Sequence, residues 1–151
     1  MADINLSAPT TGNMINEKFA TPILRWHTIT HADALAKKGS AIAQNDVFQS
    51  VPVFAGEIVE SVMVTILSPA LDAATFTVGD GSGTASWISS VTADSAAGTT
   101  FMSNSNYWFA TTPTGGKRYA ANDTIDAKLT SSALLSTTFS MDVIVKVIPV
   151  K

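Results

Sequence analysis

The feature that most constrains the fold is an alternation of apolar and polar residues with a period of two, which recurs from Ile23 to the C-terminus. It is clearest at 124–129, where every second side chain is apolar, and in the C-terminal segment MDVIVKVIPV. Successive side chains of a β-strand point to opposite faces, so this alternation predicts strands with one buried and one solvated face. The segment EIVESVMVTIL (57–67) is apolar at both phases, which predicts a strand covered at least partly on both sides. Four of its residues are expected on one face, interrupted by Glu60: Ile58, Val62, Val64 and Ile66.

The remaining elements are shorter and are separated by Gly, Pro, Asn and Asp. Weaker strands are expected at 24–30, 41–48, 75–78, 87–91 and 107–111. The segment HADALAKKG (31–39) is the single helical candidate, with Gly39 just past its end, so one short helix or none is expected. Many short strands joined by turns predict an all-β fold, an antiparallel β-sandwich of the jelly-roll-like type.

The chain divides into two parts. Residues 1–20 show neither the strand period of two nor the helical period of 3.6, and they contain the breaker cluster PTTGN. They are therefore expected to form an extended N-terminal arm or a frayed terminus. Residues 21–151 are expected to form one β-sandwich domain. The N-terminus lacks the basic region and the apolar region of a signal peptide, so no signal peptide is expected. No apolar run is long enough to predict a membrane-spanning helix.

Charge is sparse and unevenly placed. The formal net charge is −3, from nine basic and twelve acidic residues, and there is no polybasic segment, so nucleic-acid binding is not expected. Between Ala73 and Gly116 the only charged residues are Asp80 and Asp94. Such a stretch favours a surface covered by other protein, although a small hairpin-rich domain can look the same. The aromatic residues of this stretch are the interface candidates: Trp87, Phe101, Tyr107, Trp108 and Phe109. For the last three, packing in the core is the ordinary alternative.

A glycine-rich stretch, TFTVGDGSGTASWI (75–88), raises the question of a phosphate-binding loop. Its spacing is G-x-G-x-G, no helix is expected after it, and no Gly-Lys-Ser/Thr follows, so neither a dinucleotide loop nor a P-loop fits. Asp80-Gly81 is instead a favoured pair for a tight hairpin turn with positive φ. We therefore predict a hairpin built on four residues: Gly79, Asp80, Gly81 and Gly83.

No arrangement of residues predicts catalysis or a bound cofactor. The two histidines, His27 and His31, are expected too far apart along a strand to share a metal ion, and there is no cysteine. The acidic pairs, Glu57 with Glu60 and Asp123 with Asp126, are spaced to face opposite sides of strands, and we interpret them as turn and surface residues. The sequence thus predicts a protein without catalytic residues, a metal site or a cofactor, and therefore a protein that is not an enzyme.

Three segments of the sequence, in this order, resemble those of a known group of proteins: NDVFQSVPVFAGEIVESVMVTIL, ATFTVGDGSG and KRYAANDTIDAKLTSSALLSTTFSMDVIVKVI. These resemble the small β-rich virion proteins of tailed bacteriophages of the capsid cement or decoration type. The matching residues are Pro52, Ala55, Gly56, Val78, Gly79, Asp80, Gly81, Tyr119, Ala121, Asp123, Thr124 and Ile125. The match spans roughly 42–150, and the first forty residues lie outside it.

The resemblance implies a structural protein of the virion. It implies a jelly-roll-like domain that binds and stabilises the outer surface of a phage capsid, with the major capsid protein and its own copies as partners, and commonly a homotrimer. No nucleic-acid or membrane partner is expected, because the sequence has no polybasic segment and no long apolar run. The alternative is a receptor- or glycan-binding module of a head fibre or tail, in which Tyr107, Trp108 and Phe109, following SNSN, would stack on sugars.

Overall fold

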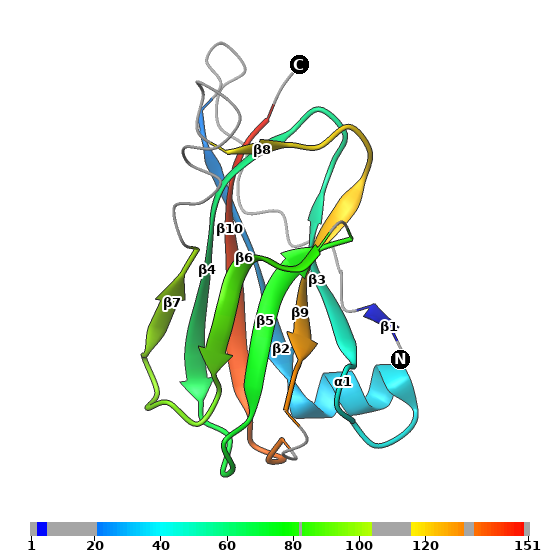
Figure 1. Cartoon of the computed structure of the whole chain (residues 1–151), viewed down its shortest axis with the longest axis vertical. Helices are drawn as coiled ribbons and strands as arrows, with labels where there is room; N and C mark the ends of the chain where they lie inside the picture. The colour runs from blue at the N-terminus through cyan, green and yellow to red at the C-terminus, as the bar shows by residue number, and fades with distance from the viewer. Residues whose placement is uncertain (1–2, 6–20, 82, 104–115, 132–134, 150–151) are drawn as a thin grey trace.

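The computed structural model describes residues 3–5, 21–81, 83–103, 116–131 and 135–149, and shows two β-sheets packed face to face (Figure 1). Sheet A has the order β1-β3-β9-β5-β6. Its strands are β1 (Asp3–Asn5), β3 (Val47–Val53), β9 (Asp123–Leu129), β5 (Thr75–Asp80) and β6 (Gly83–Thr92). Sheet B has the order β2-β10-β4-β7, and β8 also pairs with β4. Its strands are β2 (Ile23–Thr30), β10 (Ser140–Ile148), β4 (Ile58–Ser68), β7 (Thr100–Met102) and β8 (Lys117–Arg118).

The pairing of the eight main strands is nested. β2 pairs with β10, β3 with β9, β4 with β7 and β5 with β6. The outermost strands in the sequence thus pair with each other, and each further pair lies inside the previous one in the sequence. Each of these pairs is antiparallel, and the two halves of each hairpin lie in the same sheet. A long hairpin rolled into two sheets in this way is a jelly roll. The predicted all-β antiparallel sandwich is therefore confirmed, and its strand order is that of a jelly roll.

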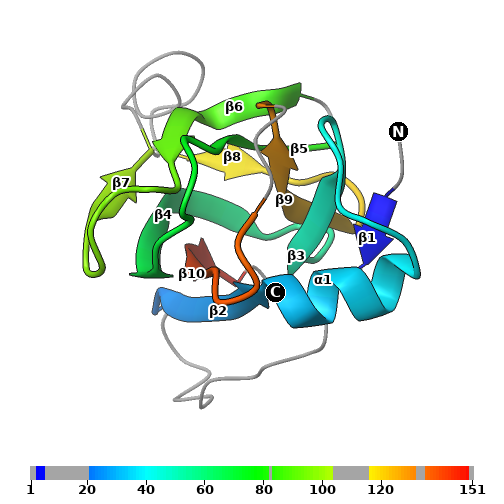
Figure 2. The ribbon, with the colours of Figure 1, turned by 90° about the horizontal axis from the view of Figure 1, so that it is seen from below.

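The core lies between the two sheets, which Figure 2 shows as two layers seen end on. The alternation predicted for β9 and β10 is confirmed, because the inward residues of both strands are buried and the outward ones are not. Three phenylalanines from different parts of the chain fill the centre: Phe76 lies 5.8 Å from Phe48 and 5.6 Å from Phe139, measured between ring centroids. Their contacts join the two halves of the nested hairpin.

The long strand β4 departs from the predicted alternation at Glu60. Val147 of β10 pairs with Val59, whereas Lys146 pairs with Ser61, so Glu60 is an extra residue on β4. This bulge places Val59, rather than Ile58 as predicted, in the core cluster with the inward residues that follow it. The charged side chain that interrupts the pattern thus marks the position where the strand changes phase.

The helical candidate does form a helix, α1 (His31–Lys38), which closes one side of the sandwich between β2 and β3 (Figure 2). It begins where the Thr30 side chain accepts a hydrogen bond from the Asp33 N–H at 3.1 Å. It ends at Gly39, whose left-handed backbone (φ 70°) lets its N–H donate to the Leu35 carbonyl. Its buried residue is Ala34, which packs into the core cluster.

Three further segments differ from the predictions. Residues 41–46 form a turn instead of the start of a strand, and β3 begins only at Val47. The turn is held by Asp46, which accepts the Ala43 N–H at 2.8 Å and forms an ion pair with Lys38. The short strands β7 and β8 have no counterpart among the predictions, because two or three residues are too few for a periodicity to be visible. The strand predicted at 107–111 falls outside the described residues.

Part of the predicted N-terminal arm belongs to the sandwich. Asp3–Asn5 forms β1, which extends the edge of sheet A by pairing in parallel with β3. These three residues thus form a strand of sheet A within the segment for which an extended arm or a frayed terminus was expected. Among the described residues, no helix has the length and apolar character needed to span a membrane.

Candidate functional site

The glycine-rich stretch connects β5 to β6. Asp80 still pairs with Gly83, so the connection consists of residues 81 and 82. The predicted positive φ is wrong, since neither Asp80 nor Gly81 has a left-handed backbone. The turn lies one residue later than the Asp80-Gly81 pair suggested, because Asp80 remains in the strand.

The glycine that the hairpin requires is Gly79. A Cβ added there would lie 1.8 Å from the Gly83 carbonyl oxygen and 2.6 Å from the Thr84 carbonyl carbon. Both are backbone atoms, which cannot rotate away. The glycines of this stretch thus allow close approach of two backbones, which is a structural role rather than the cradling of a phosphate.

Asp80 itself is a buried carboxylate. Its side chain is fully shielded from solvent and accepts hydrogen bonds from the Tyr119 hydroxyl at 2.6 Å and from Lys117 Nζ at 2.7 Å. The Trp87 indole N–H donates in turn to the Tyr119 oxygen at 3.3 Å, and Lys117 Nζ lies 5.0 Å from the centroid of the Tyr119 ring. Burial, and next the hydrogen bond to Asp80, raise the pKa of Tyr119 well above its usual range. The phenol stays neutral, and the cluster joins β5 of sheet A to β8 on sheet B.

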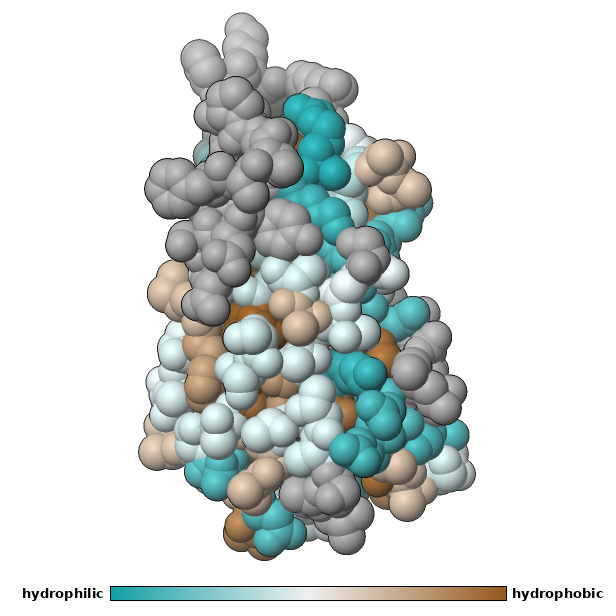
Figure 3. All heavy atoms as spheres, viewed as in Figure 1, coloured by the Kyte–Doolittle hydropathy of each residue, from teal (hydrophilic) through white to brown (hydrophobic). Residues whose placement is uncertain are grey.

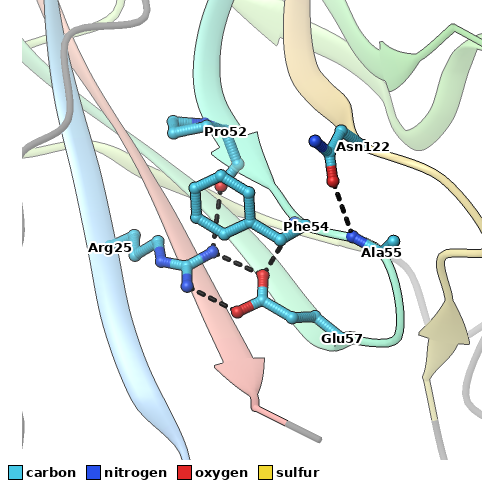
Figure 4. Close-up of polar contacts among 6 residues, drawn as sticks. All are labelled: Arg25, Pro52, Phe54, Ala55, Glu57 and Asn122. Carbon is cyan, nitrogen blue, oxygen red and sulfur yellow. Dashed lines mark hydrogen bonds and ion pairs between the residues drawn. The ribbon is translucent and has the colours of Figure 1, made fainter.

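A second ion pair lies where β3 turns into β4 (Figure 4). The Arg25 guanidinium binds both carboxylate oxygens of Glu57, at 2.5 and 2.6 Å, and also donates to the Pro52 carbonyl at 3.1 Å. The Phe54 N–H donates to the same carboxylate at 2.8 Å, and the Arg25 guanidinium carbon lies 4.9 Å from the Phe54 ring centroid. Glu57 is thus buried and fully engaged, and the interpretation of this residue as a surface carboxylate is wrong.

Backbone contacts of Tyr119 connect these two clusters. Its N–H donates to the Glu57 carbonyl at 2.9 Å, and its carbonyl accepts the Gly56 N–H at 2.7 Å. The Ala55 N–H next to it donates to the Asn122 side chain at 2.9 Å. One residue thus holds the β3–β4 turn by its backbone and the β5–β6 hairpin by its hydroxyl, and the clusters share the end of the sandwich that β8 crosses (Figure 1).

Ser103 and Gly116, the described residues that flank the segment 104–115, both lie against β4. The Ser103 N–H donates to the Val62 carbonyl at 2.8 Å. Gly116 has φ 119°, and an added Cβ would come within 2.5 Å of the Val59 carbonyl oxygen. The two flanking residues therefore lie close together on one strand.

The histidines lie in different elements, His27 in β2 and His31 at the first position of α1. Burial lowers the pKa of His27, and the nearby Asp33 and Asp142 partly offset this effect. Asp142 accepts a hydrogen bond from the Thr28 hydroxyl at 2.6 Å. Across the parts of the chain that the structure describes, no three His, Cys, Asp or Glu side chains are grouped so as to hold a metal ion.

The other acidic residues singled out in the sequence have local structural partners. Asp123 accepts the Thr124 N–H at 2.8 Å, and Asp126 accepts the Thr124 hydroxyl at 2.6 Å. Glu60, on the β4 bulge, pairs with Lys146 at 2.8 Å. These contacts order the strands on which the carboxylates lie.

The five predicted interface aromatics have different environments. Trp87 is only 2% exposed and lies in the core, where it has little surface for a partner to contact. Phe101 is partly buried and packs against the core cluster. Tyr107, Trp108 and Phe109 lie outside the described residues. An interface role for Phe101 and for residues 107–109 stays a prediction.

The structure also shows apolar surface that the sequence reasoning missed. By strand register, Trp26 pairs with Ile144, Ile144 with Met63, and Met63 with Met102, which places one apolar row across all four strands of sheet B. Trp26 and Met102, at its two ends, are 43% and 63% exposed. Strand periodicity alone could not reveal this row, because it requires the lateral register.

The outer face of sheet A is different in character. Figure 3 shows mainly pale, weakly polar side chains over its middle, and the exposed residues of β6 are Thr84, Ala85, Ser89 and Ser90. These residues belong to the charge-poor stretch recognised in the sequence. The two sheets thus present one Ser/Thr-rich face and one face with an apolar row.

Comparison with known proteins shows similarity at the level of structure alone. No protein-family model and no curated protein matches the chain. The fold is similar to a chain in the capsid of Ralstonia phage GP4, with a TM-score of 0.68, 10% identity and 99% of each chain covered. It is also similar to a chain of the cyanophage Pam1 capsid asymmetric unit, with a TM-score of 0.60, 17% identity, and 93% of this chain and 94% of that one covered.

A third similar structure is the acidic stable capsid of the Helicobacter pylori bacteriophage KHP30. Its TM-score is 0.57 at 10% identity, with 85% of this chain and 89% of that one covered. At these identities the similarity shows a shared fold. In all three comparisons the match extends over most of both chains, so the similarity covers both sheets of the jelly roll.

Proposed function

We propose that this protein is a structural component of a phage virion that binds and stabilises the outer surface of the capsid, as a cement or decoration protein does. The observation that carries the proposal is the match over 99% of both chains with a chain in the capsid of Ralstonia phage GP4. The two chains therefore match along nearly their whole length. Cyanophage Pam1 and phage KHP30 supply two further capsid chains of this fold.

The use of charged residues supports a role without catalysis. Glu57 and Asp80 are the buried carboxylates nearest to the hairpin and turn motifs, and both are held by structural partners, Arg25 for the first and Lys117 with Tyr119 for the second. A carboxylate saturated by such contacts is poorly suited to exchange protons with a substrate. We propose that the protein is not an enzyme and requires no cofactor.

The partners we propose are the major capsid protein and further copies of this chain, arranged as a homotrimer. The residues that flank the segment 104–115 lie on β4. The sequence of this segment contains Tyr107, Trp108 and Phe109, residue types that are enriched at protein interfaces. Phe101 lies on β7 shortly before it. We propose that these residues contribute to the subunit contacts and that residues 1–20 contribute to attachment to the shell.

The test uses capsids that lack this protein. The full chain is mixed with them, and bound copies are counted by gel densitometry of sedimented particles and located by cryo-electron microscopy. We expect saturable binding at hundreds of copies per particle, density on the outer surface, and a higher temperature of capsid disruption. Density inside the shell or on the tail would contradict the proposal.

A chain lacking residues 1–20 provides the matched variant. It is expected to retain the fold of residues 21–151 and to bind capsids with lower affinity. Unchanged affinity would show that this segment does not contribute to attachment. Sedimentation of the isolated full chain tests the trimer, and a monomer at micromolar concentration together with isolated copies on the particle would contradict it. The receptor- or glycan-binding alternative is not favoured, because the three similar structures are capsids.

A further inference from the structure

The N-terminal strand is attached to the domain in an unusual way. β1 pairs with β3 in parallel, with Asp3 opposite Val47, Ile4 opposite Phe48 and Asn5 opposite Gln49. All other strand pairs in the described residues are antiparallel. β1 also lies at the end of sheet A, so β3 is its only strand partner. The edge of β3 is therefore an acceptor for an added parallel strand.

This acceptor edge is not covered by the nested pairing of the jelly roll. None of the pairings among the eight main strands involves β1. A ladder of three residues at a sheet edge is among the least stable contacts of a domain and opens without unfolding of the rest. β1 can therefore leave β3 while the sandwich stays intact.

The chain between β1 and β2 is long enough to reach another molecule. Residues 6–22 separate the two strands, and a segment of this length spans up to roughly 55–60 Å when extended. A compact domain of this size measures about 35–40 Å across. A β1 strand can thus pair with the β3 edge of its own domain or with the β3 edge of an adjacent copy.

We propose that, in the assembled state, β1 of one copy pairs with the β3 edge of a neighbouring copy and so links the subunits by strand exchange. The inference rests on the proposed function insofar as assembly holds copies side by side. The occupant is a second copy of this chain, because the edge of β3 already accepts Asp3–Asn5 in a defined register. The same ladder forms in either arrangement, so the relative local concentrations of the two arms decide which one is populated.

These concentrations differ between free and assembled protein. Residues 6–22 connect β1 covalently to its own domain, and a covalent connection of this length gives β1 an effective concentration on the order of 1 mM at its own β3. At about 10 μM free protein the closed arrangement therefore exceeds the exchanged one by about 100-fold. When copies are held adjacent, the arm of a neighbour reaches a similar local concentration, and exchanged and closed pairs become comparably populated. Exchange is thus expected in the assembly and not in dilute solution.

The absence of cysteine in the sequence makes a disulfide test direct. Paired strands lie about 4.8 Å apart, within the range of Cα separations that a disulfide bridges. Two full-length single variants, Asn5→Cys and Gln49→Cys, are mixed, assembled on capsids or concentrated as oligomers, and oxidised. A disulfide between these two positions is then possible only between copies. We expect a covalent heterodimer on a non-reducing gel, at a yield at least tenfold above that of the same mixture oxidised at 10 μM without assembly.

The control mixture pairs Asn5→Cys with Ser89→Cys, which lies exposed on β6 at the opposite edge of sheet A. Each variant oxidised alone measures collisions between identical positions. The double variant Asn5→Cys/Gln49→Cys reports the closed arrangement as a ring-closed monomer. The proposal is overturned if the assembled double variant gives only ring-closed monomer and the mixture gives no more heterodimer than the control. Binding of the same variants to capsids, measured by co-sedimentation, reports separately on the proposed function.

Discussion

Gly79 is the position where the structure makes the sharpest prediction about stability. Replacement by alanine adds one Cβ, which would lie 1.8 Å from the Gly83 carbonyl oxygen, whereas real Cβ contacts essentially never fall below 3.0 Å. The oxygen belongs to the backbone of β6, so the two strands must separate by more than 1 Å. This displacement disturbs the pairing of Asp80 with Gly83 and the buried contacts of the Asp80 carboxylate.

The expected cost follows from these contributions. Forced backbone shifts in a packed region typically cost about 1–3 kcal/mol. Weakened strand pairing and poorer contacts at a buried carboxylate add about 1–3 kcal/mol. The smaller entropy of unfolded alanine recovers about 0.5–1 kcal/mol. We expect Gly79→Ala to lower the free energy of unfolding by about 3 kcal/mol, which corresponds to a decrease in Tm of roughly 10 °C in a domain of this size.

Gly83→Ala is the matched control in the same hairpin. A Cβ at Gly83 would meet only the Ser86 Cβ, at 3.6 Å, which is an ordinary van der Waals contact. We expect a change within about 0.5 kcal/mol. Urea unfolding followed by tryptophan fluorescence measures both variants, since the buried Trp87 lies near this hairpin and reports on its loss. Equal midpoints for the two variants, with unchanged m-values, would refute the close-approach argument.

Three further predictions concern the polar clusters and the segment 104–115. Glu57→Gln leaves the largely buried guanidinium of Arg25 without its counter-charge and is expected to cost about 2–4 kcal/mol in urea unfolding, whereas Lys146→Ala, at a half-exposed pair, costs less than about 1 kcal/mol. Because the pKa of Tyr119 is raised in the folded protein, stability is expected to fall as pH rises above about 10, where the unfolded phenol ionises; Tyr119→Phe should remove that part of the alkaline decline, and an unchanged decline would contradict it. Trp108→Ala is expected to lower trimer formation in sedimentation while leaving the Tm of the domain within about 2 °C; a trimer of unchanged affinity would exclude this residue from the subunit contact.

The inward and outward faces of β9 and β10 can be predicted from the sequence because the alternation lies within each strand and needs no knowledge of its neighbours. Every second residue is apolar, and burial follows that phase without interruption. In β4 the alternation alone does not predict the inward face correctly, because the bulge at Glu60 changes the phase within the strand. A charged residue within an apolar phase is the available signal for such a bulge. It does not indicate on which side the phase changes, because that depends on the register with β10.

The buried ion pairs could not be predicted from local patterns. Glu57 is 32 residues from Arg25, and Asp80 is 37 residues from Lys117. The sequence shows each carboxylate beside a turn, where solvent exposure is the usual state. Only the nested pairing of the jelly roll brings the start of β2 beside the β3–β4 turn and β8 beside β5. Trp87 illustrates the same limit, because its lack of charged neighbours fits an interface and a core equally well.

The ion pairs Arg25–Glu57 and Lys117–Asp80 lie on either side of Tyr119, at the end of the sandwich that β8 crosses. Their main effect there is on geometry. A buried ion pair contributes little net free energy relative to well-packed apolar residues, but it fixes geometry. Here the backbone of Tyr119 holds the β3–β4 turn, its hydroxyl holds the β5–β6 hairpin, and the preceding residues pair with β4 beside Gly116. A partner that contacts the segment 104–115 therefore acts on a base braced to both sheets. Because a rigid base removes part of the ordering cost of association, we expect such bracing to increase the affinity of the proposed subunit contact.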